Sequence, residues 1–329
     1  MADRRVLVTF SPSEPIRGAI AETIGPLVEV TYLGEVDSGS RLGALESAKA
    51  VLALNLDQEL NGSEEFEALA SLELLQLLSA GVDQVPFSRI PRDVPVASNA
   101  GAYAGAISEH VLAMALALAK HLPQRHADLA SGVFDQQTPN LEIRGSLVSI
   151  LGFGGIGRAS AILFRALGAR IRAITRSGSA DEWVESVGTL GDLEAALEEA
   201  DVVVISLPLT LATRGLIGER ELSLMKESAI LVNVARAAIV DEDALYRHLK
   251  SHPTFLAGLD VWWEEPRRGE RFSPRLPYLE LPNVLGSPHN SPVTSTTLVD
   301  SARQAAANIA RALRAEPVEH LVDRSEYVD

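Results

Sequence analysis

The chain has 329 residues, of which 47% are hydrophobic, and carries 29 Lys and Arg against 44 Asp and Glu, a formal net charge of −15. This length predicts two domains, and the apolar content excludes a globally disordered chain. The negative charge argues against nucleic acid and anionic membranes as partners, and the lack of cysteine excludes disulfides and thiolate chemistry.

Residues 6–78 alternate short apolar runs with helical patterns. The runs predict strands at 6–10, 27–33, 50–54 and 74–78, with the first helix at 16–24. Such alternation indicates a parallel sheet covered by helices on both faces. The fourth strand ends in the turn 79–83, whose amides are expected at the carboxyl edge of the sheet, where open α/β sheets bind ligands. A simple exit from the strand is the alternative interpretation of this turn.

A long helix is predicted from Ala104. Its apolar residues lie nearly all round the helix and include Ile107, Val111, Leu112, Ala115, Leu116 and Leu118. We expect such a helix to bridge two domains or to lie in a homodimer interface. The longest apolar run, residues 111–119, is too short to span a bilayer. Because no apolar core of signal-peptide type precedes the first strand either, we predict a cytoplasmic protein without membrane contact.

Residues 146–158 are the most informative stretch of the chain. The run 147–151 predicts a buried strand, and Gly152, Gly154 and Gly157 follow with the spacing G-x-G-x-x-G before a helix that ends at Gly168. In dinucleotide-binding turns the first glycine turns sharply, the second lets a diphosphate approach the backbone, and the third lets helix and strand pack closely. The positive end of the helix then faces an anion. A purely structural glycine turn is the alternative.

The strand after the glycine turn indicates which dinucleotide is bound. Residues 169–174 form this strand, and Thr175, Arg176 and Ser177 follow it. NAD-binding folds place an Asp or Glu here, which would repel a 2′-phosphate. A guanidinium and two hydroxyls can instead bind that phosphate. We therefore predict that NADP(H) is preferred, with NAD(H) as the lesser cofactor; an unselective surface turn is the alternative.

Three polar stretches follow later strands of the second domain. Strands are predicted at 202–207, 229–234, 256–259 and 284–285, and Arg236, Glu265 and His289 come after the last three. Parallel strands would bring these side chains to one carboxyl edge beside the nucleotide. The final helix, 294–315, has no strand left to extend, so we expect it to pack on the first domain and make that domain discontinuous.

The order of these motifs, from Ala80-Gly81 to Pro288-His289, resembles the D-isomer specific 2-hydroxyacid dehydrogenase family. The resemblance implies an α/β fold with two Rossmann-like parallel-sheet domains. The flavodoxin-like substrate-binding domain, residues 1–98 and 291–329, is discontinuous, and the dinucleotide-binding domain, residues 99–290, is inserted into it. The resemblance also implies a homodimer that reduces a small 2-keto acid, such as glyoxylate or hydroxypyruvate, to the D-2-hydroxy acid with NAD(P)H.

The resemblance further implies roles for individual residues. Arg236, Glu265 and His289 are catalytic, and Arg236 also binds the substrate. Ala80 and Gly81 offer backbone amides to the substrate carboxylate, and Tyr103 offers it a polar contact. Asp260 contacts the amide of the nicotinamide. The implied cofactor-binding residues are Gly152, Phe153, Gly154, Gly155, Ile156, Gly157, Thr175, Arg176, Ser177, Leu207, Pro208, Thr213, Val234, Ala235, Arg236, Asp260 and His289.

The chemistry of the three predicted catalytic residues fits these roles. The rigid fork of Arg236 can pair with the carboxylate and carbonyl oxygens of a 2-keto acid and so orient the ketone. His289 must be cationic to protonate the developing alkoxide, and a carboxylate such as Glu265 favours that charged form. Each of two residues, taken alone, has an alternative interpretation: Arg236 as an ordinary surface arginine and Glu265 as an ordinary loop carboxylate.

Two features depart from the family pattern. Ala237 follows Arg236 where the family commonly has glycine, so a turn with positive φ is expected to be strained or reshaped. Trp262 and Trp263 are unusually bulky beside the site, and they either narrow a substrate pocket or brace the loop.

The six remaining histidines of the seven are predicted to be solvated or structural: His110, His121, His126, His248, His252 and His320. His248 and His252 share a helix face at ligand spacing, but no third ligand accompanies them, so no metal site is predicted.

Two other functions stand as alternatives. Oxidation of formate or phosphite is a related reaction, but formate enzymes of this superfamily differ around the histidine partner, and Glu265 argues for an acid/base pair. A nucleotide-sensing corepressor shares the fold, but the extra partner-binding segments typical of that class are not found in the sequence.

Overall fold

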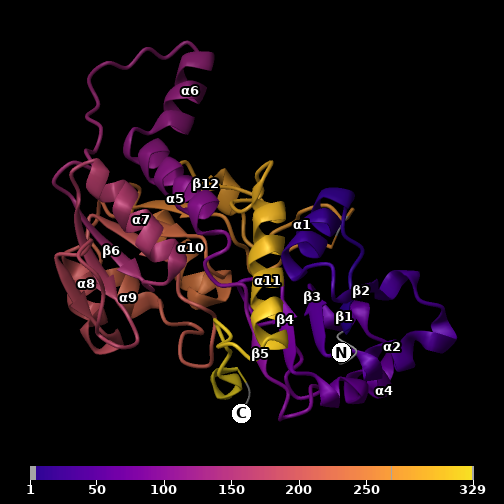
Figure 1. Ribbon diagram of the computed structural model, residues 1–329. Coiled ribbons are helices and arrows are strands. Elements are labelled where there is room, and N and C mark those ends of the chain that lie inside the picture. The colour runs from indigo at the N-terminus through magenta and orange to yellow at the C-terminus, as the bar shows by residue number, and fades with distance from the viewer. Residues whose placement is uncertain (1–4, 268, 328–329) are drawn as a thin grey trace. The chain divides into compact units, whose positions relative to one another are not determined.

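The computed structural model describes residues 5–267 and 269–327 (Figure 1). The chain divides into two compact units: unit 1 consists of Met1–Tyr103 and Val293–Asp329, and unit 2 of Ala104–Pro292. Each unit has its own parallel sheet, and unit 1 is discontinuous, so the predicted fold class is confirmed. Residues 1–4 and 328–329, at the ends of the predicted substrate-binding domain, lie outside the described residues.

The sheet of unit 1 has five parallel strands in the order β2-β1-β3-β4-β5. Their bounds are β1 Arg5–Val8, β2 Glu29–Tyr32, β3 Ala50–Ala53, β4 Leu74–Leu77 and β5 Val96–Ala97. The four strands predicted for this domain are therefore present. The fifth was not predicted, because two residues are too short to show a strand pattern.

Alternate residues of these strands belong to two separate hydrophobic clusters, as the pleat requires. On one face, Val6 and Val8 of β1 pack with α1 (Glu14–Ile24) and α11 (Thr297–Leu313). On the other face, Leu7 packs with α2 (Arg41–Ser47) and α4 (Gly62–Glu67), while α3 (Leu56–Glu59) follows β3. In Figure 1, α11 runs beside α1, although they stand at opposite ends of the chain. The predicted return of the final helix to the first domain is confirmed.

The sheet of unit 2 has seven parallel strands in the order β12-β11-β10-β9-β6-β7-β8. Their bounds are β6 Leu147–Leu151, β7 Arg170–Ile174, β8 Ser186–Gly188, β9 Val202–Ile205, β10 Ile230–Asn233, β11 Leu256–Leu259 and β12 Val284–Gly286. The strand order reverses between β6 and β9, and ligands of open α/β sheets bind at such a point. The edge strand β8 was not predicted, since it has only three residues and these are largely exposed.

Helices cover both faces of this sheet. One cluster joins the sheet to α8 (Leu193–Glu198), α9 (Glu219–Leu224) and α10 (Glu242–Ser251). On the opposite face, α7 (Gly155–Ala166) packs on β6 and β7, and α5 (Ala104–Ala119) packs on β10, β11 and α7. A Cβ on Gly258 of β11 would lie 3.2 Å from Met114 of α5, so this helix lies close against the sheet. The buried residues of α5 repeat every three or four positions along one face, whereas Leu112 and Leu116 are partly exposed, so the burial on more than one side that the apolar pattern predicts is not found within this chain.

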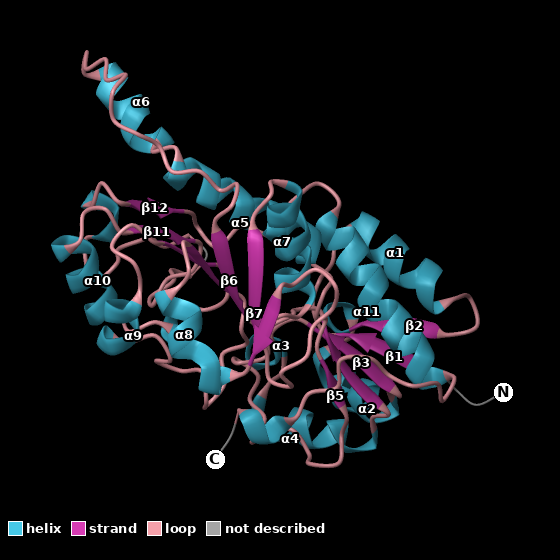
Figure 2. Cartoon of the chain, turned by 90° about the vertical axis from the view of Figure 1, so that its left-hand side faces the viewer, coloured by secondary structure: helices cyan, strands magenta, loops and turns pink. Residues whose placement is uncertain are grey.

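Helix α6 (Leu122–Ala130) and the segment after it extend away from the sheet of unit 2 (Figure 2). We call residues 122–134 the arm. Four large apolar side chains of the arm, Leu122, Leu129, Val133 and Phe134, are 51–73% exposed. Within the described part of the chain, no helix has both the length and the apolar character needed to cross a membrane.

Candidate active site

The glycine turn between β6 and α7 has the geometry that a dinucleotide requires. Gly152 has a φ of +96°, and a Cβ there would lie 2.8 Å from the backbone nitrogen of Leu207. A Cβ on Gly157 would lie 2.1 Å from the carbonyl oxygen of Gly152. Gly154, the N-cap of α7, instead faces open space, with no atom within 4 Å of such a Cβ. The turn therefore leaves bare backbone and the N-terminus of a 12-residue helix for a diphosphate.

The other predicted cofactor residues of unit 2 follow neighbouring strands at the same edge of the sheet. Thr175–Ser177 follow β7, Leu207 and Pro208 follow β9, and Val234–Arg236 follow β10. The register pairs the ends of β6, β7 and β9 directly, because Leu151 lies beside Ile174 and Ile205. Thr213 lies in the loop after β9, where its hydroxyl donates to the carbonyl of Pro208 at 2.6 Å.

His289 and Glu265 form a pair at this edge. Nδ1 of His289 lies 2.9 and 2.8 Å from the two carboxylate oxygens of Glu265. The side chains are 36% and 39% exposed. Because Nδ1 is engaged by the carboxylate, Nε2 is the ring nitrogen left to exchange a proton with another molecule. The backbone N–H of Trp262 also donates to Glu265, at 3.2 Å.

The pair is arranged to keep Glu265 ionised. Burial raises the pKa of the Glu265 carboxyl, but the hydrogen bond and charge of His289, the N–H of Trp262 and the charge of Arg236 outweigh it, and the net pKa is lowered. A carboxylate that remains charged favours a protonated imidazole beside it. The contribution of Arg236 also places its charge within electrostatic reach of the pair.

Arg236 is held in an ordered turn after β10. The buried Asn233 accepts from the N–H of Ala235 at 3.0 Å and donates to the carbonyl of Arg236 at 3.0 Å. The guanidinium Nη1 donates to the carbonyl of Ala235 at 2.8 Å. The strain expected at Ala237 is absent: it begins a 3₁₀ turn, Ala237–Ile239, and is not among the residues with positive φ. Of the two outcomes expected at Ala237, a strained or a reshaped turn, the strained one is therefore wrong, and the turn tolerates a Cβ.

The two tryptophans brace the loop between β11 and Glu265. The indole N–H of Trp262 donates to the carbonyl of Ser287, and that of Trp263 donates to the carbonyl of Val240, both at 2.9 Å. The ring of Trp263 stacks on Tyr278 with centroids 5.2 Å apart. Of the two roles considered for these residues, these contacts favour bracing.

Asp260 follows β11 and is fully buried. Its carboxylate accepts from the backbone N–H groups of Asn290 and Ser291, each at 3.2 Å. These are the two residues that follow His289, whose own φ is +50°. The buried carboxylate therefore holds the turn that carries the imidazole. Its predicted contact with a nicotinamide amide stays a prediction.

The predicted substrate residues of unit 1 also gather in one place. Ala80 and Gly81 follow β4, and the Ser79 hydroxyl donates to the Gly81 carbonyl at 2.9 Å. The Tyr103 hydroxyl donates to the carbonyl of Leu78 at 2.7 Å. Burial raises the pKa of the Tyr103 phenol, so it stays protonated at neutral pH. Its second lone pair remains chemically able to accept from a ligand.

His248 lies on α10 and His252 directly follows that helix, away from the edge of the unit 2 sheet that carries the glycine turn. Their rings stack with centroids 4.2 Å apart, and His248 also meets Phe255 edge-on. Burial and the charge of His252 lower the pKa of His248 to about 4, so it is neutral at neutral pH. Among the described residues, no three His, Asp or Glu side chains are grouped so as to hold a metal ion.

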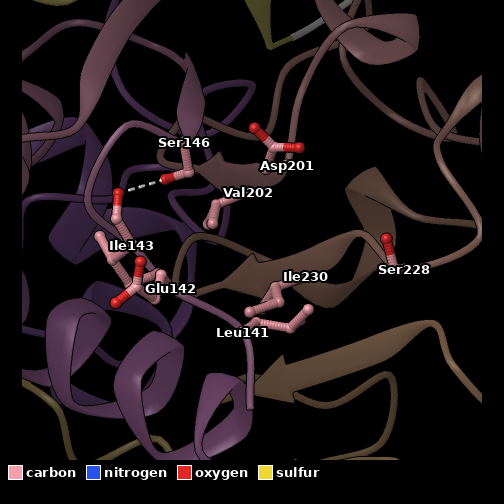
Figure 3. Close-up of a pocket in the computed structure, with 8 residues that line it drawn as sticks. All are labelled: Leu141, Glu142, Ile143, Ser146, Asp201, Val202, Ser228 and Ile230. Carbon is pink, nitrogen blue, oxygen red and sulfur yellow. Dashed lines mark hydrogen bonds between the residues drawn. The ribbon is translucent and has the colours of Figure 1, made fainter. Parts of the chain in front are cut away.

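A cavity of about 200 Å³ lies at the opposite edge of the unit 2 sheet (Figure 3). Val202 and Ile230, which begin β9 and β10, line it together with the carboxylates of Glu142 and Asp201. Asp201 already accepts from the N–H of Leu147 at 2.8 Å and pairs with Lys226 at 2.6 Å. An acidic cavity at the amino edge is not suited to a diphosphate, so the glycine turn stays the predicted nucleotide site.

Comparison with known proteins agrees with this geometry. A family model described as the NAD binding domain of D-isomer specific 2-hydroxyacid dehydrogenases matches residues 112–291, more than half of the chain. The chain belongs to the D-isomer specific 2-hydroxyacid dehydrogenase family. The resemblance carried by the sequence motifs is therefore confirmed.

Members of the 2-hydroxyacid dehydrogenase family with different names are similar to the chain. Glyoxylate reductase of Aeropyrum pernix is 34% identical over 264 residues, 77% of each chain. D-3-phosphoglycerate dehydrogenase of Methanocaldococcus jannaschii is 31% identical over 261 residues, 78% of this chain. The chain spans only 48% of the latter, about half the length of the phosphoglycerate dehydrogenases it matches.

A solved structure of the same family extends the similarity to the whole chain. The D-isomer specific 2-hydroxyacid dehydrogenase of Xanthobacter autotrophicus Py2, crystallised with NADPH and MES, has a TM-score of 0.81 and 27% identity. It covers 99% of this chain and 100% of its own. Both parallel-sheet units therefore belong to the dehydrogenase fold.

Proposed function

We propose that the protein is an oxidoreductase that reduces a small 2-keto acid, of the size of glyoxylate or hydroxypyruvate, to the D-2-hydroxy acid with a nicotinamide cofactor. The observation that carries the proposal is the His289–Glu265 pair at the edge of the sheet that also holds the glycine turn. The similarity to a glyoxylate reductase supports the small substrate. In this proposal unit 2 binds the cofactor, and unit 1 supplies some of the residues that bind the substrate.

The proposed reaction assigns one task to each side chain. The bound nicotinamide supplies the hydride. Arg236 binds the carboxylate of the keto acid through its planar fork and polarises the carbonyl. His289 gives the proton on Nε2 to the developing alkoxide, while Glu265 holds the positive charge of the imidazolium through Nδ1. Ala80, Gly81 and Tyr103 stay predicted contacts of the substrate.

An assay of keto acids tests the proposed function. Purified protein is mixed with NADPH and with glyoxylate, hydroxypyruvate, pyruvate, 2-ketoisocaproate or 3-phosphohydroxypyruvate, and oxidation of the cofactor is followed by absorbance. We expect turnover with glyoxylate or hydroxypyruvate and a product of D configuration. If no keto acid is turned over although NADPH binds, the dehydrogenase proposal fails and the nucleotide-sensing alternative gains support.

Removal of the Glu265 carboxylate is expected to slow reduction. Because the pKa of Glu265 is lowered, its carboxylate is charged throughout the neutral range and can accept from Nδ1 of His289. In Glu265→Gln that charge is lost, so kcat for keto acid reduction should fall by about 10²-fold. Steady-state kinetics at neutral pH measure the loss. The exposed neighbour variant Glu264→Gln should leave kcat unchanged, and a Glu265→Gln kcat near that of the wild type contradicts the assigned role.

We propose that NADP(H) is preferred over NAD(H). Arg176 and Ser177 are exposed after β7, where a ribose 2′-phosphate would lie in a dinucleotide fold. Asp181 of the same loop is paired with Arg158 of α7, so its negative charge is offset. We expect kcat/KM to be at least about tenfold higher with NADPH, and Arg176→Gln to remove most of that difference while rates with NADH change little. A tenfold preference of the wild type for NADH would contradict the proposal.

We also propose that the protein is a homodimer in which the arm contacts a second copy. The arm carries four exposed apolar side chains on a short projecting segment, and the family resemblance implies a dimer. Leu129→Asp with Phe134→Asp should convert a dimer of 35.2 kDa chains into a monomer, as measured by light scattering after gel filtration. The control is Leu27→Asp, at a leucine of unit 1 that is 84% exposed. A monomeric wild type, or a double variant that stays dimeric, would contradict the proposal that the arm contacts a second copy.

A further inference from the structure

A chain of polar contacts links helix α5 to the turn that carries His289. Nε2 of His110 lies 2.9 Å from the hydroxyl oxygen of Ser287, and that hydroxyl lies 2.5 Å from Oδ1 of Asp260. Asp260 in turn accepts from the N–H groups of Asn290 and Ser291. The contacts join three elements of unit 2: α5, the end of β11 and the end of β12. None of the residues in this chain of contacts touches the substrate in the proposed mechanism.

The direction of each hydrogen bond follows from what the groups can donate. A carboxylate only accepts, so Ser287 gives its single proton to Asp260. The Ser287 oxygen must then accept from His110, which fixes the hydrogen of that imidazole on Nε2. His110 is also 3.7 Å from Oδ1 of Asp260. The imidazole therefore supplies the donor that orders the serine hydroxyl, and with it the buried carboxylate.

The turn that Asp260 holds needs such support. His289 has a φ of +50°, a left-handed conformation that is uncommon for residues other than glycine. Asp260 accepts from the two N–H groups directly after this residue, and the indole N–H of Trp262 donates to the carbonyl of Ser287 before it. The left-handed backbone directs the imidazole toward Glu265, so a loosened carboxylate would loosen the catalytic pair as well.

We propose that His110 is a positioning residue, which acts through Ser287 and Asp260 to fix the left-handed turn that presents His289 to Glu265. The effect on turnover rests on the proposed dehydrogenase function, whereas the effect on the backbone does not. His110→Leu removes the donor and leaves the Ser287 hydroxyl without its partner. His110→Gln keeps an N–H donor at a similar reach. Ser287→Ala removes the hydroxyl that links His110 to Asp260.

Hydrogen–deuterium exchange of the unligated protein tests the proposal. Peptides that cover residues 287–292 report the amides of Asn290 and Ser291, and peptides that cover β6 report global opening. We expect exchange at 287–292 to rise about tenfold in His110→Leu and in Ser287→Ala, with β6 unchanged, and to stay near wild type in His110→Gln. Ala113→Ser, an exposed position of the same helix, is the control. Unchanged exchange at 287–292, or an equal rise in both regions, overturns the proposal.

Steady-state kinetics give the second readout. With a keto acid that the wild type turns over, kcat of His110→Leu should fall about tenfold while its KM changes little, and His110→Gln should recover most of the loss. A His110→Gln variant as slow as His110→Leu contradicts positioning by a hydrogen bond. If the wild type turns over no keto acid, the proposed function fails, but the exchange measurement still decides whether His110 holds the turn.

Discussion

Replacement of His289 by asparagine is expected to lower kcat for keto acid reduction by about 10³-fold, the contribution typical of a positioned general acid. Asparagine is chosen because it tolerates the left-handed backbone that His289 adopts, with a φ of +50°. It can still meet Glu265 with its amide, but it has no proton to give. The affinity for the cofactor, measured by nucleotide fluorescence, should stay within a factor of about three, because His289 is one of many predicted cofactor contacts and the glycine turn is untouched.

The chain offers a matched control for this substitution. His320 also has a left-handed backbone, with a φ of +57°, and an exposed side chain, but it lies in unit 1 and outside the predicted site. His320→Asn should therefore leave kcat and the melting temperature close to those of the wild type. A His289→Asn variant that retained more than a tenth of the wild-type kcat would show that the proton comes from another group.

The parts of the fold that the sequence predicted are those that depend on local pattern. The buried strand 147–151 and the glycine turn after it can be predicted because residues adjacent in the sequence determine their structure. The two-residue β5 and the exposed edge strand β8 have too few residues for a period to appear. Their place in the sheets is set by pairing with β4 and β7, the strands that precede them in the chain, and not by a pattern within the short strands themselves.

The candidate site also has one part that the sequence predicted and one part that it did not. The His289–Glu265 pair was predicted, because both residues follow parallel strands and must reach one edge of the sheet. The contact between His110 and Ser287 was missed, since 177 positions separate the two residues and a histidine in an apolar helix was interpreted as structural. The sequence signal for this contact is a group of three adjacent polar residues, Ser108, Glu109 and His110, on the otherwise apolar α5, and it identifies no partner.

The strain expected at Ala237 illustrates the limit of transferring a pattern from relatives. Glycine after the arginine suggested a left-handed backbone, but here the chain enters a 3₁₀ turn that any residue can adopt. Asn233 fixes the segment that leads into this turn, because it accepts from the N–H of Ala235 and donates to the carbonyl of Arg236. The placement of Arg236 thus depends on a buried amide side chain and not on a glycine.

That placement leads to the second large effect, at Arg236. Arg236→Gln should lower kcat/KM for the keto acid by about 10³-fold, because one planar guanidinium both neutralises the carboxylate and orients the carbonyl. Arg236→Lys keeps the positive charge but not the two parallel donors, so we expect it to recover about tenfold at most. The loss in Arg236→Gln should appear in both kcat and KM, since the same group acts in binding and in orientation.

Added guanidinium separates the role of the fork from any damage to the fold. In Arg236→Ala, millimolar guanidinium chloride should restore part of the activity, since the free cation can occupy the vacated space and present the same planar donors, whereas ammonium or sodium chloride at equal ionic strength should not. The exposed Arg214→Gln, which removes a charge from the same unit, is the control for long-range electrostatics and should keep kcat/KM within about twofold. Equal losses in Arg214→Gln and Arg236→Gln would mean that net charge, and not the fork of Arg236, recruits the substrate.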